Sequence, residues 1–332
     1  MILEVHHQTG GSIRQVCHVL GLARSSFYHA AAPTQSQLAD AALGDLIEEI
    51  FKRHRKRYGY RRIGSELSDH QVVCAPRRVR KIMKQRGLQA IQPNNFVPQT
   101  SDGRADAPAP NLMAERPLPE APDQVWAGDI TFIPTSSGWL YLAVVIDLCS
   151  RRIVGWSLAN HMRSDLVITA LRQAIQTRAP GRPTIFHSDR GSQYGSIAYR
   201  RLLKKAGLRQ SMSARANPYD NAWTESFIGT LKNEMLQGGC FENQADARTE
   251  IFDYLEGYYN TQRKHSALGY LTPLQYENKI LESIVTRFCA RERGSGFVRQ
   301  QARKKNSSGS GWQCPATASG AKKVFPPKWR SP

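Results

Sequence analysis

Three successive segments rich in β-branched and aromatic residues constrain the fold of this chain more than any other feature of its sequence. They are joined by tight connections, as in an antiparallel meander, and they cover residues 125–134, 139–150 and 151–159. Helix and short strand then alternate, with helices expected near 164–177, 196–206, 220–236 and 244–261 and short strands in PTIFHSD and LRQSM. This order predicts an α/β fold with a mixed sheet and helices on both faces.

A short helical pattern lies close to the start of the chain. Residues 12–29 place apolar residues at helical spacing, break at Gly21 and resume with a segment that carries Arg24, Ser25 and Ser26. This is typical of a helix-turn-helix that binds DNA through its second helix. Two short helices joined at a glycine also occur in many other helical proteins, so both interpretations are open for this segment by itself.

A strongly basic helical segment follows. Residues 52–86 hold thirteen basic and two acidic residues, a density that would repel itself without phosphate counter-charges. We therefore expect this segment to contact DNA. The arginines expected to make these contacts are Arg61, Arg62, Arg77 and Arg78. Tyr58 and Tyr60 are expected to be core residues rather than base-stacking residues.

The net charge points to the same partner. The formal charge of +19 comes from 46 Lys and Arg against 27 Asp and Glu, as expected for a protein that binds a polyanion. It is concentrated at the two ends, with about +8 in residues 1–95 and about +10 after residue 286, against about +3 in residues 121–286. A nearly balanced centre with fifteen acidic residues favours a bound cation there. Duplex DNA is the expected partner, and a metal ion is the expected cofactor.

Composition divides the chain into five segments. Residues 92–122 contain seven prolines and little apolar periodicity, which indicates an extended linker, and residues 287–332 are basic and rich in Gly, Ser and Pro, which favours disorder. The order of strands and helices between them is that of the ribonuclease H fold. We expect a helix-turn-helix-like segment at 1–50, a basic helical DNA-binding segment at 51–92, a Pro-rich linker at 93–121, a ribonuclease H-like core at 122–283 and a basic, disordered tail at 284–332.

The cysteines and the hydropathy of the chain indicate the cellular compartment in which the protein is expected. The six cysteines include no CxxC pair, which argues against a zinc ribbon and against a disulfide framework. The chain has neither a signal-peptide pattern nor an apolar run of the roughly 20 residues that a membrane helix needs. We expect a cytoplasmic protein with reduced thiols and no membrane partner.

Three acids are the candidate metal ligands. Asp129 lies within the apolar segment VWAGDITFI, where an ionised side chain is costly unless a cation pairs with it. Asp189 follows the next short strand. Glu225 lies on a predicted helix with Asn221 and Lys232 on the same helical face. A mixed sheet can bring three such acids together.

Phosphodiester chemistry explains why three carboxylates would converge. In-line displacement requires one ion to activate the attacking oxygen and a second, about 3.5–4 Å away, to stabilise the departing oxygen. Hard oxygen ligands favour Mg²⁺ or Mn²⁺, so two such ions are expected. Asp147, also at a strand end, is the alternative first ligand. His187 is expected to be a packing residue or to support a ligand rather than to act as a general base, and Trp126 and Trp156 are expected in the core.

The motifs GDIT, HSDRGSQY and ESFIGTLKNE, with 35 residues between Asp189 and Glu225, resemble the catalytic core of insertion-sequence transposases of the IS3 family, relatives of retroviral integrases. The resemblance extends over about residues 12–280. It implies that Asp129, Asp189 and Glu225 are the catalytic metal ligands and that Lys232 contacts DNA near the reacting phosphate.

Further positions match the family around this site. The resemblance implies supporting roles, in loop shape or DNA contact, for Ser188, Arg190, Gln193 and Asn221. The stretch from Tyr259 to Pro273 resembles the family's closing motif, with Thr261, Arg263, His265 and Ser266 among its positions.

The resemblance also implies a function. A family member binds the terminal inverted repeats of a mobile element, cleaves a strand with water and joins the freed 3′-OH to a target phosphodiester. The expected partners are double-stranded DNA, as element ends and as target, and further copies of this chain in a homo-oligomer on DNA. We expect this work in the bacterial cytoplasm, at the nucleoid when DNA is bound.

The sequence also departs from the family. Members are commonly made as two overlapping frames, of which the upstream one supplies a helix-turn-helix and a leucine zipper. This chain resembles the downstream product and has no heptad run of useful length, so the upstream-frame protein, or a fusion to it, is an expected partner. Two alternatives stay open: an inactive remnant or DNA-binding regulator of transposition, and a nuclease of the same fold that hydrolyses without joining.

Overall fold

The computed structural model describes residues 10–21, 23, 34–92, 108–114, 119–181, 183–214 and 222–286. The chain divides into two compact units, residues 1–279 and residues 280–332. In the second unit, the described residues 280–286 are helical.

A five-stranded mixed sheet organises the first unit, with the strand order β3-β2-β1-β4-β5. Strand β1 pairs antiparallel with β2, which pairs antiparallel with β3, while β4 pairs parallel with both β1 and β5. The strands are β1 (Val125–Thr135), β2 (Gly138–Asp147), β3 (Ile153–Ala159), β4 (Ile185–Ser188) and β5 (Arg209–Met212). The predicted meander and both predicted short strands are confirmed.

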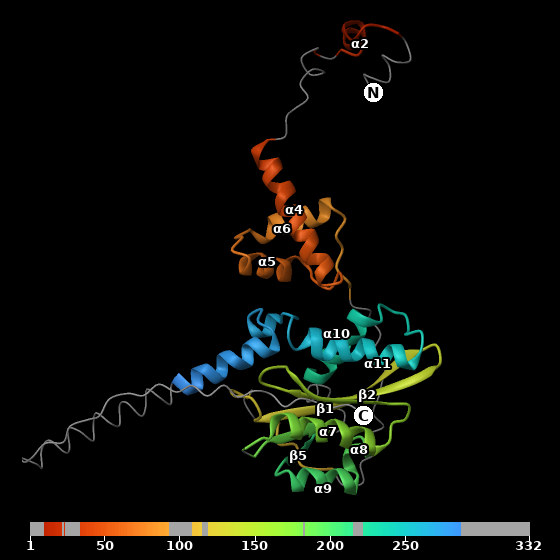
Figure 1. Ribbon diagram of the computed structural model, residues 1–332, viewed down its shortest axis with the longest axis vertical. Helices are drawn as coiled ribbons and strands as arrows, with labels where there is room; N and C mark the ends of the chain where they lie inside the picture. Colours follow the sequence, from red (N-terminus) through yellow and green to blue (C-terminus); the bar gives the residue numbers. More distant parts are fainter. Residues whose placement is uncertain are drawn as a thin grey trace, which may run out of the picture. The chain divides into compact units, whose positions relative to one another are not determined.

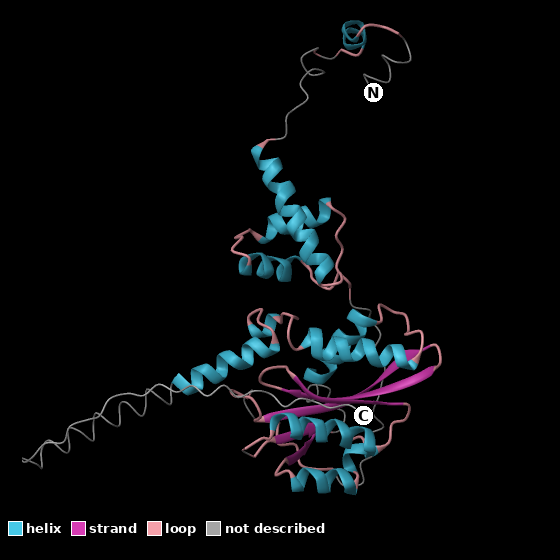
Figure 2. Cartoon of the chain, in the orientation of Figure 1, coloured by secondary structure: helices cyan, strands magenta, loops and turns pink. Residues whose placement is uncertain are grey.

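Helices cover both faces of this sheet, as expected (Figures 1 and 2). One face carries α7 (Ser164–Arg178), α8 (Ser192–Gly195) and α9 (Ile197–Lys205). The other carries α10 (Ala222–Met235) and α11 (Gln244–Phe252), which continues into a π-helical turn, η2 (Asp253–Tyr259). A 3-10 turn, η3 (Ser266–Leu268), and a helix from residue 273 complete the unit.

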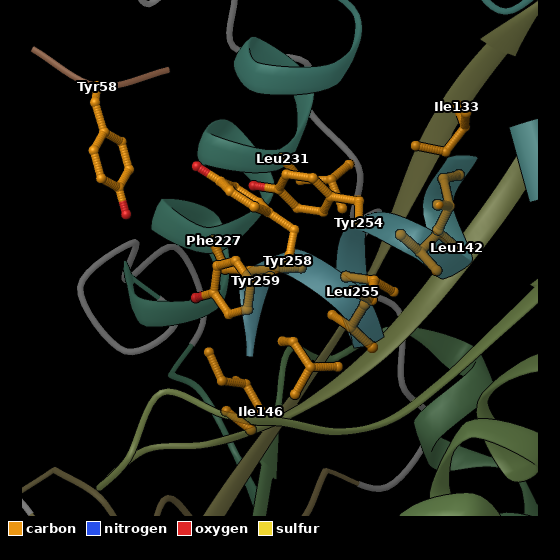
Figure 3. Packing of buried hydrophobic residues seen from close by; sticks show 14 of the residues in the cluster. Tyr58, Ile133, Leu142, Ile146, Phe227, Leu231, Tyr254, Leu255, Tyr258 and Tyr259 are labelled. Carbon is orange, nitrogen blue, oxygen red and sulfur yellow. The ribbon is translucent and has the colours of Figure 1, made fainter. Parts of the chain in front are cut away.

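Alternation along β1 assigns its side chains to these faces. Val125, Ala127 and Ile133 pack into the core with α10 and η2, whereas Trp126 and Ile130 pack into the core with α7. Figure 3 shows the first of these cores, where tyrosines of η2 meet apolar side chains of α10 and of the sheet. The sheet thus separates two cores of different composition.

The region before the sheet is helical. It contains α2 (Ile13–Val19), α4 (Gln35–Arg53), α5 (Tyr60–Asp69) and α6 (Pro76–Gln85). The last three helices bury one another's apolar side chains, and these are Ile47, Ile50, Phe51, Ile63, Leu67, Val79, Ile82 and Met83. The segment boundary expected at residue 50 falls within α4. The second helix expected in residues 12–29, with Arg24 and Ser25, lies outside the described residues.

Part of the expected linker lies against the sheet. The backbone N–H of Leu112 donates to the Ser211 hydroxyl at 2.9 Å, and the N–H of Met212 donates to the Pro110 carbonyl at 3.4 Å. Residues 108–114 therefore cover edge strand β5, which would otherwise present unpaired backbone groups.

None of the helices in the described ranges combines the length and the apolar character that crossing a bilayer requires.

Candidate active site

Two of the three candidate carboxylates lie on neighbouring parallel strands. Strands β1 and β4 pair with Gly128 opposite Ser188, so Asp129 and Asp189 each follow directly after this pair. Adjacent strands are about 4.8 Å apart, and alternation directs Asp129 towards the α10 face. Asp129 is only 7% exposed. The strand register therefore places the two acids side by side on neighbouring strands.

Local backbone contacts hold both acids. The N–H of Ile130 donates to Asp129 Oδ1 at 2.7 Å, and the N–H of Gly191 donates to Asp189 Oδ1 at 3.0 Å. Gly128 has a steric role here, because a Cβ atom at this position would lie 2.5 Å from Cζ of Phe186. The glycine of the GDIT motif thus leaves room for the Phe186 ring next to Asp129.

Helix α10 crosses the same face of the sheet. It buries Thr224, Phe227, Leu231 and Glu234. Glu225 in its first turn is exposed, and Lys232, seven residues later, lies on the same side of the helix. Burial lowers the pKa of Lys232, and the Asp129 carboxylate opposes that shift. Lys232 is therefore close enough to Asp129 for the two charges to interact.

The structure does not gather the complete set of ligands. Within the ranges that it describes, no three His, Cys, Asp or Glu side chains come close enough to form a metal site. Asp129 and Asp189 are adjacent, and Glu225 is on the helix above the same face but stays exposed. The donor chemistry nevertheless fits a hard divalent cation, because the two aligned candidates are carboxylates, one buried and one partly buried, on neighbouring strands of the sheet.

Side-chain hydrogen bonds to backbone carbonyls hold the loop after Asp189. The guanidinium of Arg190 donates to the Ser213 carbonyl at 2.9 Å, the Gln193 amide donates to the Met162 carbonyl at 3.0 Å, and the Ser188 hydroxyl donates to the Asp189 carbonyl at 3.0 Å. These contacts favour a role in loop shape over DNA contact for Arg190 and Gln193. Asn221, expected near the same site, lies outside the described residues.

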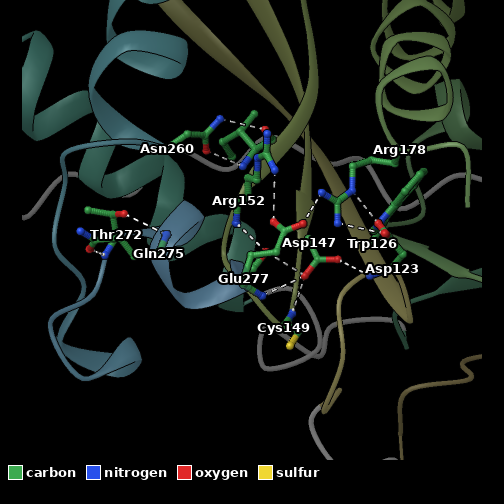
Figure 4. Close-up of polar contacts among 12 residues, drawn as sticks. Asp123, Trp126, Asp147, Cys149, Arg152, Arg178, Asn260, Thr272, Gln275 and Glu277 are labelled. Atoms are coloured by element: carbon green, nitrogen blue, oxygen red, sulfur yellow. Dashed lines mark hydrogen bonds and ion pairs between the residues drawn. The ribbon is translucent and has the colours of Figure 1, made fainter. Parts of the chain in front are cut away.

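Asp147 has a different environment from Asp129. It lies opposite Trp126, on the other face of the sheet from Asp129, and it is completely buried. Its Oδ1 accepts hydrogen bonds from the N–H groups of Cys149 and Ser150, and its Oδ2 accepts one from Asp123 at 2.7 Å (Figure 4). Burial raises the pKa of Asp147 despite these bonds. The contacts make Asp147 a structural carboxylate of the turn after β2, which leaves Asp129 as the better candidate.

A second buried network joins the same turn to the closing motif. Arg178 at the end of α7 binds Asp123 through two hydrogen bonds of 2.8 and 2.9 Å and forms an ion pair with Glu277 (Figure 4). Asn260 of the closing motif pairs with the backbone N–H and carbonyl of Ile153 at 2.9 and 3.0 Å. The residues after η2 are thereby fastened to the sheet.

Glu234 is the residue that sequence reasoning missed. It is buried on α10, and the Arg263 guanidinium of the closing motif donates to both of its oxygens, at 2.7–3.1 Å. The Tyr254 hydroxyl donates to Glu234 Oε2 at 2.9 Å. Burial opposes the charge on Arg263, but the Glu234 carboxylate prevails and raises the pKa of Arg263. This pair fixes α10, and with it Glu225 and Lys232, to the rest of the unit.

The N-terminal helices contact the core at this same place. The Tyr58 hydroxyl donates to the Gln262 carbonyl at 3.0 Å and accepts from the Lys264 N–H at 2.8 Å. The Lys264 ammonium donates to Asp69 at 2.5 Å and lies 3.3 Å from Glu66. Tyr58 is completely buried, so its expected place in a core is confirmed.

The four arginines expected to bind DNA differ in environment. Arg61 and Arg77 are exposed. Arg78 is exposed but paired with Asp40 at 2.6 Å. Arg62 is partly buried, its guanidinium 3.9 Å from Glu234 and 5.6 Å from the Tyr58 ring, and burial lowers its pKa. Arg62 thus contacts interior side chains, which favours a packing role over the expected DNA contact.

Sequence families match most of the chain. The family "Integrase core domain" matches residues 119–218, and a second integrase core family matches residues 206–273. The family "HTH-like domain" matches residues 37–96. This last match covers α4, α5 and α6 and lies after residues 12–29, where the sequence pattern suggested a helix-turn-helix.

Individual relatives agree with these families. The chain is 41% identical to the transposase for insertion sequence element IS904 of Lactococcus lactis subsp. lactis (strain IL1403), over 74% of this chain and 97% of the relative. It is 38% identical to transposase InsF for insertion sequence IS3A of Escherichia coli (strain K12), over 83% and 97%. Among solved structures, the HTLV-2 integrase catalytic core domain in complex with magnesium shows 20% identity and a TM-score of 0.37, over 47% of this chain and 97% of that one.

Proposed function

Because the chain belongs to the IS3 family of insertion-sequence transposases, we propose that its site cleaves the ends of a mobile element and joins them to a target, with Asp129, Asp189 and Glu225 as the ligands of two divalent metal ions. One observation carries the assignment of residues: Asp129 and Asp189 follow the same paired position of two parallel strands. Alternative acids lack this arrangement, and Asp147 in particular faces the other side of the sheet.

The three proposed ligands differ in how firmly the protein holds them. Asp129 and Asp189 are fixed by backbone N–H groups, so they would hold their oxygens in place before metal or DNA arrives. Glu225 is exposed at the start of α10 and would close the set from the opposite side. When bound, two Mg²⁺ or Mn²⁺ ions supply activation of the attacking oxygen and stabilisation of the departing one.

Charged residues near the site would position the DNA. Lys232 lies beside Asp129 on the helix that carries Glu225, so its ammonium would contact a phosphate next to the reacting one. Arg61 and Arg77, exposed on α5 and α6, would bind the backbone of the element end. Such phosphate contacts fix position without reading sequence. The segment 34–92 is therefore proposed as the end-binding part and residues 119–279 as the catalytic part.

The proposed assembly has more than one chain. An element has two ends, and each end needs one active site, so we propose a homo-oligomer on DNA. We also propose that the upstream-frame protein, or a fusion to it, contributes to end recognition.

The test uses labelled inverted-repeat DNA and an unlabelled target, incubated with the purified chain and Mg²⁺, both alone and with the upstream-frame protein. Asp129→Asn and Asp189→Asn should each lower the rates of cleavage and joining by about 10³-fold, because a lost metal ligand removes several kcal/mol of transition-state stabilisation. Asp253→Asn, at an exposed acid of η2, is the matched control and should keep the wild-type rates.

Metal binding provides an independent readout. Mn²⁺ at a concentration of about 100 times its Kd should stabilise the wild-type fold by about 2.7 kcal/mol, and both Asp→Asn variants should lose that stabilisation. Nicks without joined products would favour the nuclease instead. DNA retardation without chemistry in either metal would favour the regulator.

A further inference from the structure

Helix α9 exposes a row of cations that the proposed chemistry does not use. Arg200, Arg201, Lys204 and Lys205 are all exposed on this nine-residue helix. The surrounding stretch, residues 190–214, contains six basic residues and no acid. No ion pair joins the four α9 cations to any residue in the described ranges, in contrast to Arg78 and Arg86 of the N-terminal helices, which are held by Asp40 and Asp45.

This arrangement costs stability in the isolated protein. Residues 200 and 204, and residues 201 and 205, are like-charge pairs one turn apart, and each such pair destabilises a helix by a few tenths of a kcal/mol. The opposite side of α9 buries Tyr199 and Leu203, so the four cations stay together on the solvent-exposed side. A polyanion laid along the helix would offset the repulsion.

The exposed side of α9 is also open to solvent. Ile197, Arg200, Arg201 and Lys204 line an open depression of about 370 Å³. Cations in successive turns are about 5.4 Å apart along the helix axis, and duplex DNA offers one phosphate per about 1.7 Å of its axis. Several phosphates therefore fall within reach of a helix of this length.

Helix α9 packs against β4, the strand that ends directly before Asp189. The Tyr199 ring packs edge-on against Phe186 of β4 at 5.6 Å and against Tyr194 of α8 at 5.4 Å. Tyr194 and Tyr199 are both buried. Asp189 lies three residues after Phe186, so DNA held by α9 would stay at a fixed position relative to that carboxylate.

We propose that the α9 surface, formed by Arg200, Arg201, Lys204 and Lys205, binds the phosphate backbone of duplex DNA without regard to sequence and holds the target duplex during strand transfer. The binding part stands on the charges of α9 and on their exposure alone. The assignment to the target, rather than to the element end, rests on the proposed function. The exposed arginines of α5 and α6 lie in the segment that matches the HTH-like family, and this segment is proposed to bind the element end. The α9 surface is therefore assigned to the target.

The experiment compares two variants of the full chain with equal loss of charge. Arg200→Glu/Lys204→Glu alters the α9 surface. Arg248→Glu/Lys279→Glu, at exposed positions of α11 and of the helix from residue 273, is the matched control. Fluorescence anisotropy measures the affinity of each for a short mixed-sequence duplex across a salt series, and the cleavage and joining assay is run in parallel. A neutral variant, Arg200→Gln/Lys204→Gln, shows whether reversal itself disturbs the fold.

The α9 variants should reduce the slope of log Kd against log salt by about 2, since each lost phosphate contact accounts for about 0.9 of it. They should keep end cleavage within about twofold of wild type and lose at least about tenfold in joining, a transition-state loss of about 1.4 kcal/mol. A salt slope equal to that of the control would overturn the inference, and a change in oligomeric state at an unaltered slope would assign α9 to protein contact. If duplex binding depended on α9 but the chain cleaved no DNA, the binding part of the inference would stand, and the proposed function, with the assignment to the target, would be rejected.

Discussion

The two faces of the sheet are held by different forces. On the α7 and α9 face, most buried side chains are apolar or aromatic, and Asp147 at the end of β2 is a buried exception. Helix α7 approaches this face so closely that a Cβ atom on Gly155 would lie 2.3 Å from the Ala170 carbonyl oxygen. On the α10 face, a similar apolar core is crossed by buried charges, with Glu234 and Arg263 in a bidentate pair. Close apolar packing thus dominates on the first face, and a buried ion pair inside the core distinguishes the second face, which carries the proposed chemistry.

The largest effect on stability should come from breaking the Glu234 pair. Arg263→Met leaves a buried carboxylate without its cation, and such an uncompensated charge costs about 3–5 kcal/mol. The free energy of unfolding, measured with urea, should fall by that amount. The double variant Arg263→Met/Glu234→Leu should recover much of the loss, because apolar replacement of a whole buried pair is often close to neutral. Equal losses in the single and double variants would contradict a role for the pair in fixing α10.

Overpacking should be the next largest effect, and it probes the other face. In Gly155→Ala the new methyl group meets the Ala170 oxygen at 2.3 Å and the Ala174 nitrogen at 2.7 Å, both backbone atoms, so α7 must shift. We expect a loss of about 3 kcal/mol in the free energy of unfolding, the upper part of the usual range. Gly64→Ala, in open space within α5, is the control and should gain about 0.5–1 kcal/mol. A harmless Gly155→Ala would show that the α7 face is not fixed by shape.

The sequence was sufficient to predict most of the fold. Alternating apolar residues in β1 and β2 and helical spacing in α7 and α10 are local patterns, and the structure confirms each element. The motif interval was enough to select Asp189 and Glu225 as candidates. The choice between Asp129 and Asp147 needed the sheet register, because the two acids differ in the face they occupy and in the backbone donors around them.

Long-range polar contacts could not be predicted in the same way. Glu234 ends a motif on α10, and nothing in its neighbours indicates a partner at Arg263, 29 positions away. Arg62 and Arg77 both belong to a basic segment, yet only Arg62 turns inward, because Tyr58 and Glu234 surround it. Periodicity shows which side of a helix is buried, but it does not show against what the helix packs.

A smaller effect should come from the contact between the N-terminal helices and the closing motif. Tyr58→Phe removes the acceptor of the Lys264 N–H and the donor to the Gln262 carbonyl. A buried backbone group left without a partner costs about 1–2 kcal/mol, and urea unfolding should show this loss. Tyr60→Phe, two residues along at a partly exposed position, is the matched control. If both variants were equally stable, the N-terminal helices would not depend on this hydrogen-bonded hydroxyl.

The smallest effect concerns pH and the same polar face. Burial, with Arg263, Arg62 and Arg151 nearby, lowers the pKa of His265 to about 2, against about 6.5 in the unfolded chain. Between these values the unfolded chain binds a proton that the folded protein does not, so His265 supports the fold fully above pH 6.5 and progressively less below it. One such group changes the free energy of unfolding by up to about 1.4 kcal/mol per pH unit. His265→Asn should therefore flatten the loss of stability measured between pH 6.5 and pH 5.5, and His70→Asn, at an exposed position, should not. If His265→Asn kept the wild-type slope of unfolding free energy against pH, other groups would be responsible for the loss of stability in acid. The arginines around His265 would then not explain the pH dependence of this face.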